Sequence, residues 1–142
     1  MLSPMTTERH AGGCQCGAVR FTVEGPLRDV LYCHCGRCRR SHGGIAAYSA
    51  CERADLSFAS DGDLRWFENP DPTDEARRGF CGRCGSRLFW EHADLTTISV
   101  AAGSLDEPSG VRAIGHIFTA HKGDYYDLVD DGLPRWNDSL GD

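Results

Sequence analysis

The sequence lacks an apolar run long enough to span a membrane, and its charged, proline-containing start at residues 1–10 lacks the apolar core of a signal peptide. Lysine is nearly absent, because Lys122 is the only one and the other basic side chains are arginines. The formal net charge of −6 argues against a broad phosphate-binding surface. We therefore expect a cytoplasmic protein that acts neither on nucleic acid nor at a membrane.

Internal repeats, low-complexity tracts and linkers are also missing, so the 142 residues predict one domain with its own apolar core. Short alternating or apolar stretches recur between turns rich in glycine and proline, which predicts a mainly β fold. Residues 39–44 suit one or two helical turns that end at a glycine. Strands are expected at 19–23, 29–32, 45–51, 56–59, 64–67, 87–91, 96–101 and 112–119.

Cysteine is abundant, and seven of the eight cysteines fall into three tight groups. Only Cys51 stands apart, in an apolar stretch that predicts a buried, inert thiol. In a reducing compartment such groups indicate metal binding more than a disulfide framework, which stays the alternative. Soft thiolate ligands favour zinc. The groups are Cys14/Cys16, Cys33/Cys35/Cys38 and Cys81/Cys84.

The first and last groups, Cys14, Cys16, Cys81 and Cys84, supply four thiolates, the closed tetrahedral shell of a structural zinc. Metal binding there would tie two distant parts of the chain together and stabilise the fold. Because four sulfurs leave no open position, this site is expected to do no chemistry. A rubredoxin-like iron is the competing metal.

The central group, Cys33, Cys35 and Cys38, supplies only three thiolates, which is typical of a catalytic zinc with an exchangeable fourth position. That position can hold water, a substrate thiolate or a protein group such as His42. His34 is expected to point away from the metal, and either to form a local hydrogen bond, to face a pocket or to lie on the surface. A single cluster of all seven thiolates is the alternative arrangement.

The three cysteine motifs resemble the glutathione-dependent formaldehyde-activating enzyme (GFA) family. They read GCQCG at 13–17, CHCGRCRR at 33–40 and FCGRCGS at 80–86, and residues 102–106 (AGSLD) and 116–118 (HIF) are also similar. The resemblance spans residues 12–136. It leaves residues 1–11 as an N-terminal tail that is expected to be disordered, and residues 137–142 as a C-terminal tail.

The resemblance implies a β-tent fold of short antiparallel strands held by two zinc ions. Cys14, Cys16, Cys81 and Cys84 match the family's structural ligands, and Cys33, Cys35 and Cys38 match its catalytic ones. It also implies carbon–sulfur lyase activity, the reversible joining of formaldehyde and glutathione to S-(hydroxymethyl)glutathione.

Zinc chemistry agrees with this reading, because the cation favours ionisation of a thiol that enters the open position. Polarisation of the aldehyde oxygen is the second possibility, although three thiolates make zinc a weak Lewis acid. His34 and His42 are the candidate general acids. Arg37, Arg39 or Arg40 are candidates to hold substrate carboxylates.

Two other function classes stay open from the sequence. One is a non-enzymatic zinc module that binds a protein partner. The other is thiol redox chemistry or metal storage. The sequence does not indicate an oligomeric state.

Overall fold

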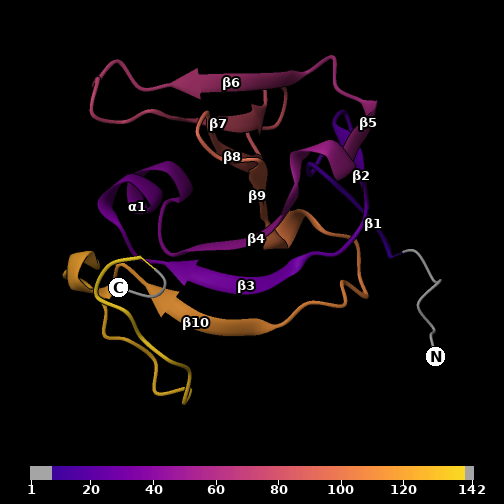
Figure 1. Ribbon diagram of the computed structural model, residues 1–142. Helices are drawn as coiled ribbons and strands as arrows, with labels where there is room; N and C mark the ends of the chain where they lie inside the picture. The colour runs from indigo at the N-terminus through magenta and orange to yellow at the C-terminus, as the bar shows by residue number, and fades with distance from the viewer. Residues whose placement is uncertain (1–7, 140–142) are drawn as a thin grey trace, which may run out of the picture.

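Two β-sheets pack face to face in the computed structural model, which describes residues 8–139 (Figure 1). The smaller sheet has the order β1-β2-β5, and the larger has the order β10-β3-β4-β9-β8-β7-β6. The predicted mainly β, single-domain β-tent fold is confirmed. None of the helices in the described part of the chain is long and apolar enough to cross a membrane. The elements are β1 (Arg9–Gly13), β2 (Arg20–Glu24), β3 (Arg28–Cys33), α1 (Gly36–His42), β4 (Ala46–Glu52), β5 (Leu56–Ser60), β6 (Leu64–Glu68), β7 (Ala76–Cys81), β8 (Arg87–His92), β9 (Thr97–Ala101) and β10 (Ala113–Ile117), with 3-10 turns at Arg53–Asp55, Ala102–Ser104 and Thr119–His121.

Each predicted strand is present, with ends that differ from the prediction by at most two residues. The helical segment is also present, and it ends at Gly43 in the left-handed conformation that glycine adopts without strain. The apolar run of β4 is explained by burial on both sheet faces. Cys51 packs between the sheets, while Ala46 and Tyr48 pack on the opposite side.

The prediction that residues 1–11 form a disordered tail was wrong for residues 9–11, which belong to β1 and pair with β2. Residues 1–7 lie outside the described part. The strand has small residues in place of an alternating pattern because its neighbours come close. A Cβ atom on Gly12 would lie 2.5 Å from the Phe21 ring and from the Ser104 carbonyl oxygen.

The first residues of the predicted C-terminal tail, which starts at residue 137, are hydrogen-bonded to the rest of the domain. The carbonyl groups of Asn137 and Asp138 accept bonds from the backbone of Ala120 and Phe118. The predicted tail at 137–142 is therefore tied to the domain through its first residues, and residues 140–142 lie outside the described part.

One strand pair departs from the predicted antiparallel arrangement, since β10 pairs with β3 in parallel. A parallel partner needs a long crossover, and the chain between β3 and β10 includes most of the fold. The pairing places Ile117 next to Cys33 and His116 next to Tyr32. It therefore brings the C-terminal part of the chain to the central cysteine motif.

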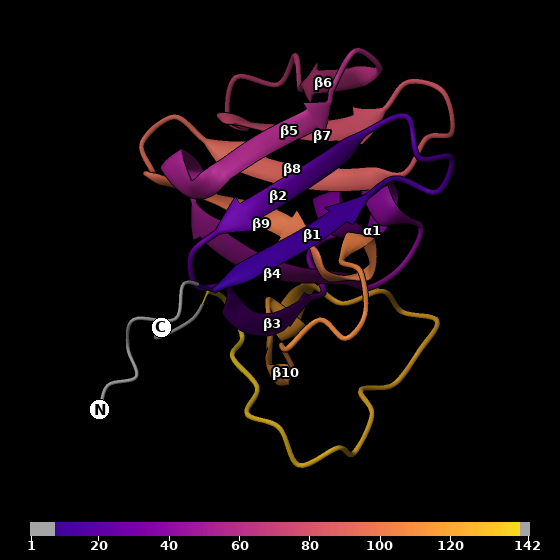
Figure 2. The same cartoon turned by 90° about the vertical axis from the view of Figure 1, so that its right-hand side faces the viewer.

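The main core lies between the two sheets, where β1, β2 and β5 cross over β8 and β9 (Figure 2). Phe21 and Phe89 meet there edge to face, with ring centroids 5.2 Å apart. A second, smaller apolar cluster lies on the other face of the large sheet and contains Cys33, Cys38 and Tyr48. This outer face carries the site described next.

Candidate metal centres and the adjoining cavity

The four-cysteine cluster, Cys14, Cys16, Cys81 and Cys84, brings four sulfur atoms within 4.8 Å of one another. The Cys14–Cys16 and Cys16–Cys81 sulfur distances are 3.6 and 3.8 Å. Tetrahedral zinc with Zn–S bonds of about 2.3 Å requires sulfurs about 3.8 Å apart. The donor set therefore fits a zinc ion, with the ligands that the sequence predicts.

Hydrogen bonds to the sulfurs favour the thiolate forms of Cys14 and Cys84, whereas desolvation and the neighbouring thiols raise the pKa of Cys16 to about 11. The Val19 amide donates to Cys14 Sγ over 3.2 Å. The Ser86 hydroxyl donates to Cys84 Sγ over 3.1 Å and lowers the pKa of that thiol to about 5. The hydrogen bonds at Cys14 and Cys84 thus favour the binding of a cation by this cluster.

The three-cysteine cluster, Cys33, Cys35 and Cys38, also has its sulfurs within 4.8 Å of one another. Cys33 ends β3, Cys35 is the N-cap of α1, and Cys38 lies in the first turn of that helix. Cys35 Sγ accepts a bond from the Cys38 amide over 3.3 Å, the role that an oxygen usually has at a helix start. Helix formation therefore gathers the three thiols.

The three thiols cannot ionise independently. Hydrogen bonds from the Cys33 and Cys38 thiols lower the pKa of Cys35, and the same contact with Cys35 raises the pKa of Cys33. Three neighbouring thiolates repel one another, so full ionisation needs a cation between them. This donor set, too, fits a zinc ion, with three protein ligands.

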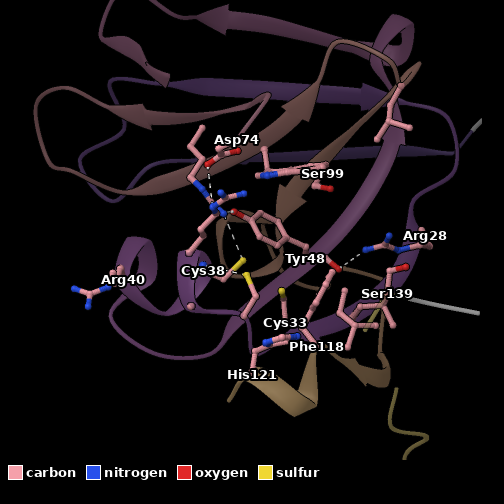
Figure 3. Close-up of a pocket in the computed structure, with 18 residues that line it drawn as sticks. Arg28, Cys33, Cys38, Arg40, Tyr48, Asp74, Ser99, Phe118, His121 and Ser139 are labelled. Carbon is pink, nitrogen blue, oxygen red and sulfur yellow. Dashed lines mark hydrogen bonds and ion pairs between the residues drawn. The ribbon is translucent and has the colours of Figure 1, made fainter. Parts of the chain in front are cut away.

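A cavity of about 1140 Å³ adjoins the three-cysteine cluster (Figure 3), and Cys14 of the other cluster lines a separate, smaller cavity of about 590 Å³. Cys33, Cys35 and Cys38 line the larger cavity, and no residue of the four-cysteine cluster does. The other walls are largely apolar and come from β3, β8, the loop between β8 and β9, the end of β10 and the segment after it. They include Leu31, Trp90, Leu95, Ile117 and Phe118.

A buried arginine on β7 also lines the cavity. Arg78 donates to Cys38 Sγ over 3.6 Å and to the Tyr48 hydroxyl over 3.3 Å. It pairs in register with Trp90 on β8, so both side chains stand on the cavity face of the sheet. The sequence analysis missed Arg78, because nothing in the local pattern distinguishes it from Arg77.

Comparison with known proteins identifies the family. The sequence profile of the family described as "Glutathione-dependent formaldehyde-activating enzyme" matches residues 9–121. The chain belongs to this family. A Halomonas elongata protein provisionally named as a glutathione-dependent formaldehyde-activating enzyme is 26% identical over 152 residues, which cover 92% of this chain and 95% of the relative.

The solved structure of a Rhodobacter sphaeroides protein has the same fold, with a TM-score of 0.55 at 24% identity. The match covers 89% of this chain and 98% of the other. At this identity the likeness establishes the fold alone. The GFA family match and the two cysteine clusters are the findings that bear on chemistry.

His42, the candidate fourth ligand, does not join the three-cysteine group of this GFA family member. Its Nε2 atom lies 2.7 Å from the Tyr48 hydroxyl. Burial, followed by the positive charge of Arg78, lowers the pKa of His42 to about 4. Since Tyr48 accepts from Arg78, its proton is free to point to His42, and the neutral ring accepts it.

His34 lies in the interior at 1% exposure, so the surface alternative was wrong. Its Nδ1 atom is 2.7 Å from the Tyr126 hydroxyl, and its Nε2 atom is 2.9 Å from Nδ1 of His116. His116 continues the chain of bonds to Asp131 over 2.8 Å. Both ring nitrogens of His34 are therefore engaged away from the cavity, which instead contains His121 as a lining residue.

The three candidate arginines of the central motif differ in position. Arg37 and Arg40 line the cavity, and Arg39 does not. Arg37 is 3.5 Å from both Asp71 and Asp74, so acidic groups already balance its charge. Arg40 is exposed and stays a candidate for a substrate carboxylate.

Cys51 is buried at 4% exposure in the main core, as predicted, and burial raises the pKa of its thiol to about 11. All eight cysteines are free of disulfide bonds. The structure thus favours the metal framework over the disulfide alternative. The two separate sulfur groups also exclude the single seven-thiolate cluster.

Proposed function

We propose that this protein catalyses the reversible addition of a small thiol to formaldehyde or a related small aldehyde, and so acts as a carbon–sulfur lyase in the reverse direction. One observation carries the proposal: all three cysteines of the three-cysteine cluster line the larger, mostly apolar cavity, whereas only Cys14 of the separate four-cysteine cluster lines a cavity, the smaller one. Family membership supports the same chemistry.

Two zinc ions complete the proposed enzyme. Cys14, Cys16, Cys81 and Cys84 would hold a structural ion, and Cys33, Cys35 and Cys38 would hold a catalytic one. An ion bound by the three-cysteine cluster supplies the positive charge that keeps an incoming thiol ionised at neutral pH. The largely apolar walls of the cavity limit the water that competes for the reacting groups.

The proposed reaction needs no oxidant or reductant. The thiol releases its proton to solvent, and its sulfur forms a bond to the carbonyl carbon. The electron pair of the carbonyl double bond moves to oxygen, which then takes a proton to give the hydroxyl group of the adduct. The reverse sequence breaks the carbon–sulfur bond and returns the aldehyde.

Glutathione is the proposed thiol, since the family description and the name of the Halomonas relative both include it. A cavity of about 1140 Å³ is large for formaldehyde alone and has room for a tripeptide thiol beside it. Arg40 at the cavity is placed to meet a carboxylate of such a thiol. The free cysteines are consistent with a reducing, cytoplasmic location.

Exchange spectroscopy with ¹³C-formaldehyde and glutathione tests the function, because it measures the rate between free aldehyde and adduct at equilibrium. Zinc-loaded wild type should raise this rate above the uncatalysed one. Cys35→Ser should abolish the increase and keep about one zinc per chain. Cys51→Ala is the matched control, because that thiol lies outside both clusters and should leave the rate unchanged.

The alternative, a zinc module that only binds a protein partner, predicts no acceleration by wild type. An active Cys35→Ser protein with two zinc ions would contradict the proposed division of roles between the clusters.

A further inference from the structure

Arg78 is a buried cation without an acidic partner among the described residues. Its exposure is 9%, and no described carboxylate lies within ion-pair distance of it. A guanidinium group stays charged in proteins, and burying an unpaired charge costs several kcal/mol. Such a group is retained most readily where it meets negative charge, which the thiolates of the three-cysteine cluster supply in part and a bound substrate can supply as well.

The side chain is held firmly in place. Its hydrogen bonds to Cys38 Sγ at 3.6 Å and to the Tyr48 hydroxyl at 3.3 Å use only part of its five N–H donors. Tyr48 is fixed in turn by His42 at 2.7 Å. The guanidinium therefore lies beside the three-cysteine cluster, lines the cavity and keeps donor capacity.

The other arginines that line the cavity differ from Arg78 in ion pairing or in exposure to solvent. Arg37 is balanced by Asp71 and Asp74. Arg28 and Arg40 are exposed, so water screens their charges. Arg78 alone among them is both buried and in hydrogen-bond contact with a sulfur of the three-cysteine cluster.

We propose that Arg78 binds the oxygen of the carbonyl substrate and stabilises the negative charge that forms there as the thiol sulfur attacks the carbon. This inference rests on the proposed function and adds an electrophile-binding residue to it. In the step, the carbon–sulfur bond forms, the carbonyl electron pair moves to the oxygen beside Arg78, and water supplies the proton that completes the hydroxyl group. No other reactant is required.

The expected size of the effect follows from comparable sites. Removing one donor to a developing oxyanion lowers kcat by about 100- to 1,000-fold. If Arg78 served only to balance the charge of the thiolates, its loss would instead weaken metal or thiol binding. The two roles therefore separate in the measurements.

The test compares zinc-loaded Arg78→Gln with Arg77→Gln, its neighbour on β7, which pairs with Glu91 on the other side of the strand. Arg78→Gln should retain two zinc ions and bind glutathione within about twofold of wild type. Its kcat should fall by about 100-fold or more. Arg77→Gln should keep both properties.

Two further measurements do not rely on the loss of kcat in Arg78→Gln. One measures ligand binding without turnover, and the other measures whether an added compound restores the rate of a variant. Binding of ¹³C-formate, a one-carbon anion, should weaken about tenfold or more in Arg78→Gln and stay unchanged in Arg77→Gln. Added guanidinium should restore part of the rate to Arg78→Ala, which a merely structural residue would not allow.

A kcat near the wild-type value in Arg78→Gln would overturn the inference, and so would a loss explained wholly by missing zinc or weaker thiol binding. If wild type gives no acceleration, the proposed function fails. Formate binding that still depends on Arg78 would then identify an anion site, and formate binding equal in all variants would exclude one.

Discussion

The two cysteine clusters have the same kind of ligand and differ in how the chain assembles them. The four-cysteine cluster joins residues 65 positions apart, as in Cys16 and Cys81, whereas the three-cysteine cluster comes from a single run at 33–38. A metal held by distant ligands stabilises chain closure, and one held by local ligands stabilises little beyond its own turn.

The surroundings of the two cysteine clusters also differ. Around the four-cysteine cluster, turn amides and the Ser86 hydroxyl bind the sulfurs, and Cys81 is fully buried in the main core. Around the three-cysteine cluster, the neighbours are a cavity and a buried arginine. The comparison supports the proposed roles, fold stability for the four-cysteine cluster and chemistry for the three-cysteine cluster.

Removing a ligand from each cluster should have very different effects on folding. Cys81→Ser should prevent stable folding, because structural zinc binding contributes about 10–16 kcal/mol and a domain is stable by only about 5–15 kcal/mol. Cys35→Ser should fold and lose one zinc. Thermal unfolding followed by circular dichroism, with zinc analysis, measures both. Equal loss of stability in the two variants would break the comparison.

Chelation should separate the clusters in time. The three-cysteine cluster is open to the cavity, so a competing chelator should remove its zinc first and abolish activity while the fold persists. The second zinc should leave only as the protein unfolds. Zinc release, activity and circular dichroism recorded on one sample test this order, and simultaneous loss of all three would refute it.

Acid should act on the four-cysteine cluster through Cys84. In the metal-free protein its folded pKa is lowered to about 5 by the Ser86 hydroxyl, so its contribution to stability is present at higher pH and is lost as pH falls through about 5. Ser86→Ala removes the hydroxyl that lowers this pKa, so zinc release from this cluster should begin at a higher pH. Release from the three-cysteine cluster in the same protein is the internal control and should keep its midpoint.

The smallest expected effect concerns His42. If its imidazole were a fourth ligand of the second zinc, the three-cysteine cluster would also have a closed shell, and the two clusters would no longer differ in this respect. We expect its imidazole to titrate near pH 4 in zinc-loaded protein, because burial disfavours the charged ring. With the folded pKa below the unfolded one, its contribution to stability rises with pH between about 4 and 6.5. Proton NMR measures the midpoint, and a ring locked by metal would show none.

The sequence predicts well which sulfurs lie together, because close spacing within a motif restricts where they can go. Cys35 and Cys38 are gathered by one helical turn, and glycine-rich turns flank the other pairs. The strands with alternating apolar residues could also be predicted from the sequence. Strands β1 and β7 were not predicted. In β1, close packing against Phe21 requires small residues that carry no pattern. In β7, the sequence ARRGFC shows no apolar alternation, and its end overlaps the cysteine turn.

The parts of the site that the sequence does not predict depend on contacts between elements that are far apart in the sequence. Arg78 acquires its position from the register of β7 against β8, which sequence spacing does not encode. The sequence left a local hydrogen bond, a pocket and the surface open for His34, but its partners Tyr126 and His116 arrive with the C-terminal segment and the parallel strand β10. Long-range pairing of this kind decides which side chains face the cavity.

The most direct test of the division is ¹¹³Cd NMR of the cadmium-substituted protein during titration with glutathione. The account predicts two resonances, of which one stays fixed and the other moves as thiol enters the open position; only the moving one should vanish in Cys35→Ser. Two resonances that both move, or both stay fixed at saturating thiol, would contradict it.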